Sequence, residues 1–358
     1  MITSYISTKS PYMLFTTTTT KTYGVFDIFI YQGTQTTGRS INPTYQLVSS
    51  TFDTKGNVEI SPFIDSITEQ QFDGMYATNG VWVDHQYTLT DDIGNITGSP
   101  TTIISEFALP GYSYFEDGLN YISVNTNGLL IDNDEIQIAV GEGVTVPIFT
   151  DVTETVTLKD VDNNTLNTVD VTSLTGNTSS SKIFYYQFVG EYPGELGSLE
   201  VKSAVGTTTI KIVEVTECKY DPIKITFLNR YGVLQDLWFF KRKDVTMNVT
   251  QDEYKRSLID ISTESYNTFN HQKQVYNKVA KEVVDLNSGF VPESFNPVFK
   301  QLLISDRVWM TGDINGVNTI RPVNVTNSAF DFKYKLDEKL INHSIKLDLA
   351  FDTINNIA

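Results

Sequence analysis

The sequence predicts a mainly β protein made of tandem β-sandwich modules, followed by a C-terminal β-rich domain that contains one short helix. β-Branched and aromatic residues are frequent, which favours strands over helices. Short apolar runs are separated by turn-forming residues at intervals of about 8–12 residues, a spacing typical of sandwiches and barrels. The 358 residues suffice for two or three domains of about 100–200 residues each.

The first module is predicted to be a β-sandwich spanning residues 1–105. Its expected strands are Tyr23–Tyr31, Tyr45–Phe52, Val58–Ile60 and Val81–Leu89. A turn is expected at residues 53–57, and Pro62 is expected to end the third strand. A threonine run, Thr16–Thr20, precedes the first strand, and no function is assigned to it.

The second module, residues 106–215, is predicted to be an acidic β-sandwich of about immunoglobulin size, without a disulfide. Its expected strands are Tyr121–Val124, Glu135–Val140, Thr153–Leu158, Ile183–Val189 and Thr207–Val215. Glycine- and asparagine-rich stretches between these strands supply the turns.

The third module, residues 216–358, is predicted to be a neutral, β-rich assembly domain. Strands are expected at Ile223–Leu228 and Val233–Phe240, joined by a turn at Asn229–Gly232. A helix is expected near residues 292–303, because apolar residues at 295, 298, 299, 302 and 303 fall on one face. Ser294 and Pro292 are suitable residues to start it.

Two further segments of the third module carry predictions. Residues 250–290 fit either long strands or a poor helix, and their spacing of Tyr and Val favours strands. A terminal β-hairpin is expected, since Phe330–Leu336 and Ile345–Phe351 both alternate apolar with polar residues.

The net charge of −17 is unevenly distributed. Residues 1–215 hold 8 Lys/Arg against 25 Asp/Glu, whereas residues 216–358 hold 18 of each. The acidic first part disfavours nucleic acid as a partner. The distribution indicates an acidic, solvated part joined to a neutral part that docks on other surfaces.

Several site types are excluded by composition. One cysteine, Cys218, allows no internal disulfide and no cysteine-built metal site, and three scattered histidines do not suggest a metal centre. No run approaches the ~18 apolar residues of a membrane span, so no membrane contact is expected. The first residues lack a signal-peptide pattern, so synthesis in the cytoplasm without a secretion signal is expected.

No catalytic, cofactor-binding or metal-ligating residue is predicted, and the chain is not expected to be an enzyme. Asp160–Asn164 has the spacing of the first calcium ligands, but Thr165 and Val171 replace the required glycine and glutamate, so a polar turn is the preferred interpretation. Whether this loop or the acidic run Asp132–Glu135 binds calcium stays open. The Ser179-x-x-Lys182 spacing has no companion motif and is interpreted as an ordinary loop.

Two other features receive structural interpretations. Lys241-Arg242-Lys243 is the one tight basic cluster and is interpreted as a solvated strand end, with an acidic partner surface as the alternative. Trp82, Trp238 and Trp309 lie in apolar segments and are expected to be core residues rather than sugar platforms.

The last third of the chain resembles tail-associated virion proteins of tailed bacteriophages, especially those that infect Bacteroidota. The resemblance rests on the block Asp221–Phe240, on Leu286–Glu293 and Gln301–Ser305, and on Leu340–His343 with the terminal hairpin. The first 215 residues match only loosely, mainly at Val58–Ile64. The resemblance implies a structural subunit of a tail or baseplate ring, located in the virion, and brings no catalytic residues.

We therefore expect a virion structural protein whose partners are copies of itself in a ring and other tail or baseplate proteins. Residues 216–358 are expected to make the inter-subunit contacts through exposed terminal strands, while the acidic modules project outward. Removal of residues 337–358 is then expected to abolish assembly. A head or collar subunit is a variant of this hypothesis, a receptor- or glycan-binding adhesin is the alternative, and a glycan-degrading enzyme is the least favoured.

Overall fold

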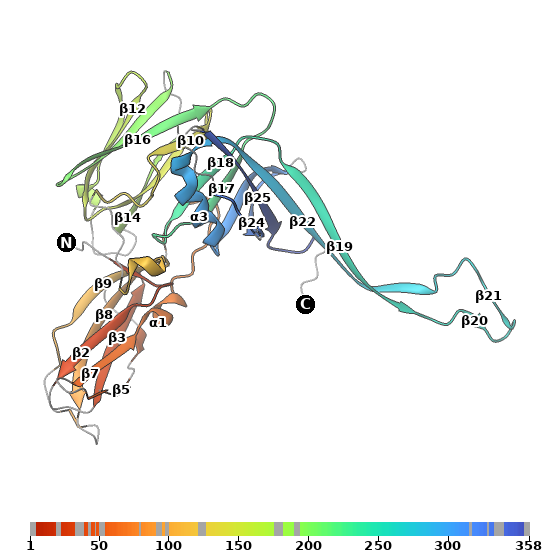
Figure 1. Ribbon diagram of the computed structural model, residues 1–358, viewed down its shortest axis with the longest axis horizontal. Helices are drawn as coiled ribbons and strands as arrows, with labels where there is room; N and C mark the ends of the chain where they lie inside the picture. The colour runs from red at the N-terminus through yellow and green to blue at the C-terminus, as the bar shows by residue number, and fades with distance from the viewer. Residues whose placement is uncertain are drawn as a thin grey trace.

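Three β-rich lobes and one long projecting arm make up the molecule in a computed structural model (Figure 1). The prediction of a mainly β protein with sandwich modules and one short helix in the C-terminal domain is confirmed. The structure describes residues 5–18, 23–32, 39–41, 44–46, 48–49, 54–78, 80–90, 95–96, 100–120, 127–174, 182–189, 194–314, 317–327, 329–332 and 340–353.

The first lobe is a sandwich of two sheets. One sheet has the order β1-β9-β8-β3-β4 with β5 beside β3, and the other has the order β2-β7-β6. Apolar side chains between them, including Leu14, Phe26 and Val83, are buried. The elements are β1 Tyr5–Ser7, β2 Met13–Thr18, β3 Tyr23–Gln32, β4 Arg39–Ile41, β5 Thr44–Gln46, β6 Val48–Ser49, β7 Thr54–Glu59, α1 Ser61–Asp65, β8 Val81–Thr90, β9 Ile104–Leu109 and η1 Phe115–Asp117.

Two details of the first lobe differ from the sequence prediction. Residues 54–57, expected in a turn, belong to β7, which pairs with both β2 and β6. The expected module boundary at residue 105 lies inside β9, whose pairing with β8 and β1 ties residues 104–109 to the first lobe.

The second lobe is also a sandwich. A five-stranded sheet of order β10-β16-β15-β12-β13 faces the two-stranded sheet β11-β14. Its core includes Val146, Leu158 and Ile210, and it also takes in Trp238 and Phe240 from the third lobe. The elements are β10 Glu135–Ala139, β11 Val144–Phe149, β12 Thr153–Asp160, β13 Thr165–Asp170, η2 Thr172–Leu174, β14 Ile183–Phe188, β15 Leu196–Ser203 and β16 Gly206–Val215. The expected strand at residues 121–124 lies outside the described residues.

The third lobe is one seven-stranded sheet of order β18-β17-β23-β24-β25-β22-β19. The predicted helix is confirmed as η3 followed by α3, which buries Phe295, Val298, Phe299 and Leu302 against this sheet. The elements are β17 Ile223–Leu228, β18 Leu234–Phe239, β19 Asp244–Lys255, β20 Ile259–Asp260, β21 Ser265–Tyr266, β22 Lys273–Pro292, η3 Glu293–Phe295, α3 Asn296–Ile304, β23 Val308–Ile314, β24 Val317–Val325 and β25 Leu340–Leu349.

The predicted terminal hairpin is wrong in its pairing. β25 pairs with β22 on one side and β24 on the other, so it is an interior strand without a free edge. Phe330 and Phe332 form no strand but pack on the core that contains Phe299, and residues 333–339 lie outside the described residues. Removing residues 337–358 takes a central strand out of the sheet, so that truncation tests folding rather than assembly.

A core shared by all three lobes joins them at one place. It contains Trp82 and Phe107 from the first lobe, Tyr185 from the second, and Tyr231 and Trp309 from the third. Each of these side chains is at most 9% exposed, so the lobes meet through a packed apolar junction.

Candidate functional site

The most prominent candidate for a functional surface is the arm, defined here as residues 248–279. The arm comprises the outer parts of β19 and β22 and the small hairpin β20-β21, and it extends far from the three lobes (Figure 1). The preferred interpretation of residues 250–290 as strands is thus confirmed for β19 and β22. At about 3.3 Å per residue, the 12 residues of β19 alone span about 40 Å.

Nothing in the arm is buried. Every residue from 248 to 279 is exposed or half-buried, and the described part of the chain places no third strand beside it. Large apolar side chains nevertheless occur along its whole length: Val249, Tyr254, Ile259, Ile261, Tyr266, Phe269, Val275, Tyr276 and Val279. An isolated two-stranded ribbon is at best marginally stable in water, so a surface of this kind favours a partner that covers it.

A β-bulge lies in the arm. Asp252 is opposite Asn277 and Glu253 is opposite Val275, which leaves Tyr276 without a partner in the register. The Tyr276 ring lies 6.2 Å from the ring of Tyr254 across the ribbon. A bulge bends its strand, increases its twist and blocks regular edge pairing. The arm is therefore protected against indiscriminate strand addition on one edge.

The third lobe, which bears the arm, is hydrogen-bonded to the second lobe at the junction. The turn after β17 begins at Asn229, whose buried amide donates to the Leu130 carbonyl oxygen at 2.7 Å and to Gln235 at 3.0 Å. Tyr231 and Gln301 both donate to the carboxylate of Asp132, the second of these bonds being 2.6 Å long. These bonds connect the second lobe to the turn and to α3 of the third lobe.

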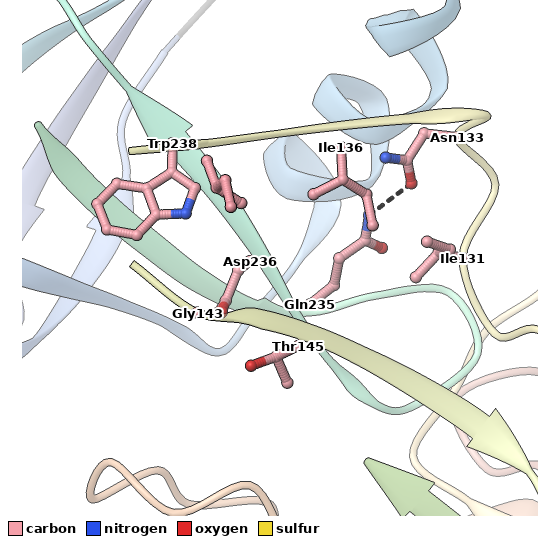
Figure 2. A pocket seen from close by; sticks show the side chains of 9 residues that line it. Ile131, Asn133, Ile136, Gly143, Thr145, Gln235, Asp236 and Trp238 are labelled. Atoms are coloured by element: carbon pink, nitrogen blue, oxygen red, sulfur yellow. Dashed lines mark hydrogen bonds between the residues drawn. The ribbon is translucent and has the colours of Figure 1, made fainter. Parts of the chain in front are cut away.

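A cavity at this junction is too small for an organic ligand. It lies between Ile131–Thr145 of the second lobe and β18, and Gln235 donates across it to Asn133 at 3.2 Å (Figure 2). Its volume of about 20 Å³ accommodates about one water molecule, whereas ligand pockets occupy hundreds of Å³. The cavity belongs to the packing between lobes.

A larger groove opens on the first lobe, between β2 and the strands β8 and β9. Its volume is about 750 Å³, and its lining combines Tyr12, Phe15 and Tyr87 with His85 and Glu106. The Tyr12 hydroxyl donates to one oxygen of Glu106 at 2.7 Å, and Nε2 of His85 lies 3.0 Å from the other. The groove therefore has aromatic side chains around the Glu106 carboxylate, whose two oxygens contact Tyr12 and His85.

The electrostatics of this groove keep the tyrosine neutral. Burial, followed by the charge and hydrogen bond of Glu106, raises the pKa of the Tyr12 hydroxyl above its usual value. The neutral Tyr12 hydroxyl donates a hydrogen bond to the Glu106 carboxylate and orients it. The arrangement suits binding of a polar ligand with apolar faces rather than nucleophilic chemistry by the tyrosine.

The motif candidates of the sequence have structural roles. Asp160 accepts backbone N–H groups of Asp162 and Asn164 at 2.9 and 2.7 Å, so this segment is a polar hairpin turn. Lys182 forms a buried ion pair with both oxygens of Asp151 at 2.8 Å, and Ser179 lies outside the described residues.

The basic cluster and the tryptophans also have structural roles. Lys241 pairs with Glu217 at 2.7 Å, and Arg242 pairs with Asp244 at 2.6 Å. The three tryptophans are at most 8% exposed, which confirms them as core residues. In the described residues no group of three acidic, histidine or cysteine side chains is placed to hold a metal ion. Among the same residues, no helix has the length and apolarity to cross a membrane.

Comparison with known proteins does not assign a family. No protein-family model matches the sequence, and a search of curated proteins gave no match.

The arm and the groove were both missed as sites by the sequence. The arm has one usable signal: large apolar residues recur in a polar segment without the period-two alternation of a half-buried strand. The groove has no such signal, because its residues come from separate segments: Glu106 lies 21 positions from His85 and 94 positions from Tyr12.

Proposed function

We propose that this chain is a virion structural protein, a ring-forming subunit of a bacteriophage tail or baseplate that acts through contacts between subunits. The arm is the single observation that carries the proposal. A ribbon with exposed apolar side chains over residues 248–279 offers a large contact surface. The resemblance of residues 216–358 to tail-associated proteins supports the same class of function.

The arm also fits the geometry of a ring. A ring requires head-to-tail contacts, in which one surface of a subunit meets a different surface of the next. A projecting element at one end of the molecule meets this requirement, because it can reach a neighbour without a two-fold axis. The packed junction between the lobes supplies a stiff body from which the arm projects.

Shortening the arm tests this function. Thr250 and Val279 lie directly opposite each other, so an Asn-Gly turn can replace residues 251–278 and leave the seven-stranded sheet intact. Light scattering and negative-stain images are expected to show rings for the wild type and monomers for the shortened chain. Circular dichroism and thermal unfolding check that the shortened chain is folded. Identical rings from both proteins, or a wild type that stays monomeric at every concentration, refute the proposal.

A second candidate function, glycan or receptor binding by a virion adhesin, is supported by the groove on the first lobe. Aromatic side chains beside a held carboxylate are the groups that bind sugar rings and hydroxyls. A second aromatic pair, Tyr112 and Tyr114, is less available to a ligand, since Lys300 lies 3.7 Å and Arg230 4.8 Å from the ring centre of Tyr114.

A glycan array tests this second function. Binding is expected to disappear in Tyr87→Ala and Glu106→Gln and to persist in Phe115→Ala, whose side chain is 99% exposed outside the groove. No binding by the wild type, or equal binding by all four proteins, removes this candidate.

A further inference from the structure

A local cluster of basic residues lies where the tip of the arm begins, next to exposed apolar side chains. Lys255 of β19 is directly opposite Lys273 of β22, and Arg256 follows at once; these three residues are called the basic collar. Glu253 is 3.8 Å from Lys273, and within the described residues Lys255 and Arg256 form no ion pair. Like charges that face each other across a ribbon are destabilising, so the collar favours a partner of opposite charge.

The tip beyond the collar, residues 257–272, exposes four large apolar side chains among polar residues, and it also carries the carboxylates of Asp260 and Glu264. Ile259, Ile261, Tyr266 and Phe269 are 69%, 88%, 65% and 90% exposed. The tip hairpin β20-β21 is only two residues long on each side. A surface that receives this end of the arm should therefore offer apolar side chains to the four tip residues and carboxylates to the basic collar.

One end of the second lobe has this combination. β12 ends at Asp160 opposite the start of β15, and β16 ends at Val215 beside the end of β10. The start of β15 lies beside the end of β16, and the start of β11 is opposite the end of β14. The segments that follow β10, β12 and β14 therefore lie at the same end of the sandwich. They present Val140, Val161 and Val189, which are 58%, 55% and 80% exposed.

Acidic residues adjoin these three valines. Glu142, Asp162 and Glu195 are exposed in the same segments, and the Val161 N–H donates to the Glu195 carbonyl oxygen at 3.1 Å. This surface, Val140, Glu142, Val161, Asp162, Val189 and Glu195, is called the acidic end.

The charge of the second lobe supports a cationic partner. Residues 127–215 contain 4 lysines, no arginine and 13 carboxylates, a net charge of −9. All four lysines, at positions 159, 182, 202 and 211, already pair with carboxylates of the same lobe. No lysine of the second lobe is therefore left to neutralise the carboxylates of the acidic end.

We propose that the tip of the arm docks on the acidic end of the second lobe in a neighbouring copy of this chain. The four apolar tip residues cover the three valines, while the basic collar faces the carboxylates. This contact joins two different surfaces and is head-to-tail, as a closed ring requires. The inference rests on the proposed ring-forming function and adds to it the surface that receives the arm. It also differs from the expectation that the acidic second module projects outward, because the second lobe would now take part in the contact between subunits.

Charge reversal on each surface tests the contact. The arm variant is K255E/R256E and the acidic-end variant is E142K/D162K/E195K. Each is expected to weaken association at least about tenfold at about 0.1 M salt, with a smaller difference at about 1 M salt, where charges are screened beyond about 3 Å. A chain carrying all five substitutions is expected to regain association, because both signs are exchanged. Sedimentation velocity over a concentration series measures each protein.

Two single reversals serve as matched controls. Lys278→Glu changes the charge on the arm outside the collar, and Asp134→Lys changes an exposed carboxylate at the opposite end of the second lobe. Both are expected to associate like the wild type. Thermal unfolding of every variant confirms that these exposed substitutions leave the fold intact.

The outcomes separate this inference from the proposed function. If the arm variant is monomeric while the acidic-end variant assembles normally, or if the five-substitution chain fails to recover, the receiving surface is wrong and the arm function stands. If neither the collar reversal nor the shortened arm affects assembly, both are wrong.

Discussion

Replacing Ile261 and Phe269 by alanine is expected to weaken association without affecting the fold. Their side chains are 88% and 90% exposed in the single chain, so nearly all of their apolar surface is available for burial in a contact. Burying one such side chain stabilises by about 1.5–3 kcal/mol, and alanine retains about 0.8 kcal/mol of that. The double substitution should then cost about 1.4–4.4 kcal/mol of association free energy, which is a roughly 10- to 1700-fold larger dissociation constant.

Sedimentation equilibrium gives the dissociation constants, and thermal unfolding gives the stability of the monomer. The unfolding free energy is expected to change by less than about 0.5 kcal/mol, because exposed side chains contribute little to folding. Phe115→Ala removes a fully exposed ring distant from the arm and should leave association unchanged. A double variant that associates within about threefold of the wild type refutes the assignment of the tip as a contact surface.

Three other changes have defined outcomes. Lys182→Met leaves Asp151 buried without its lysine and should destabilise the fold by about 3–5 kcal/mol in urea unfolding, whereas adding Asp151→Leu should restore most of the loss. Gly232→Ala should destabilise by more than about 1 kcal/mol in the same assay, because the residue has φ +79° and a Cβ would lie 2.6 Å from a backbone nitrogen. Hydrogen bonds from Ser262 lower the pKa of the Asp260 carboxyl. The ionised carboxylate therefore stabilises the folded tip above the ordinary carboxyl pKa, and this stabilisation is lost as the pH falls through the lowered pKa of Asp260. An NMR titration in which the Ser262 amide signal does not change on acidification contradicts this.

Local periodicity explains what the sequence could predict. The strand Ile223–Leu228 and the helix near residues 292–303 each bury one or both faces against a core. For this reason the sequence predicts the bounds of both elements to within a few residues. β13 and the outer part of β19 gave no comparable signal, because their side chains are largely exposed on both faces. Alternation reports burial on one face, so a strand without a buried face is not distinguished from a loop.

Long-range packing explains what the sequence could not predict. Phe330 and Phe332 alternate with polar residues as a strand does, yet they pack on the core that contains Phe299, while β25 pairs with the long β22. The bond between Gln301 and Asp132 joins residues 169 positions apart. Neither pairing follows from neighbouring residues, because each depends on how complete sheets and lobes meet.

The continuity of β22 has a mechanical consequence. One strand of 20 residues begins in the arm, continues as an interior strand between β19 and β25, and leads directly into η3 and α3 at the junction of the lobes. A pull on the tip along the strand direction therefore loads many ladder hydrogen bonds in parallel, rather than opening them one after another. Tension on the arm is therefore transmitted into the body of the molecule through one uninterrupted strand, β22, with no break in that strand at the base of the arm.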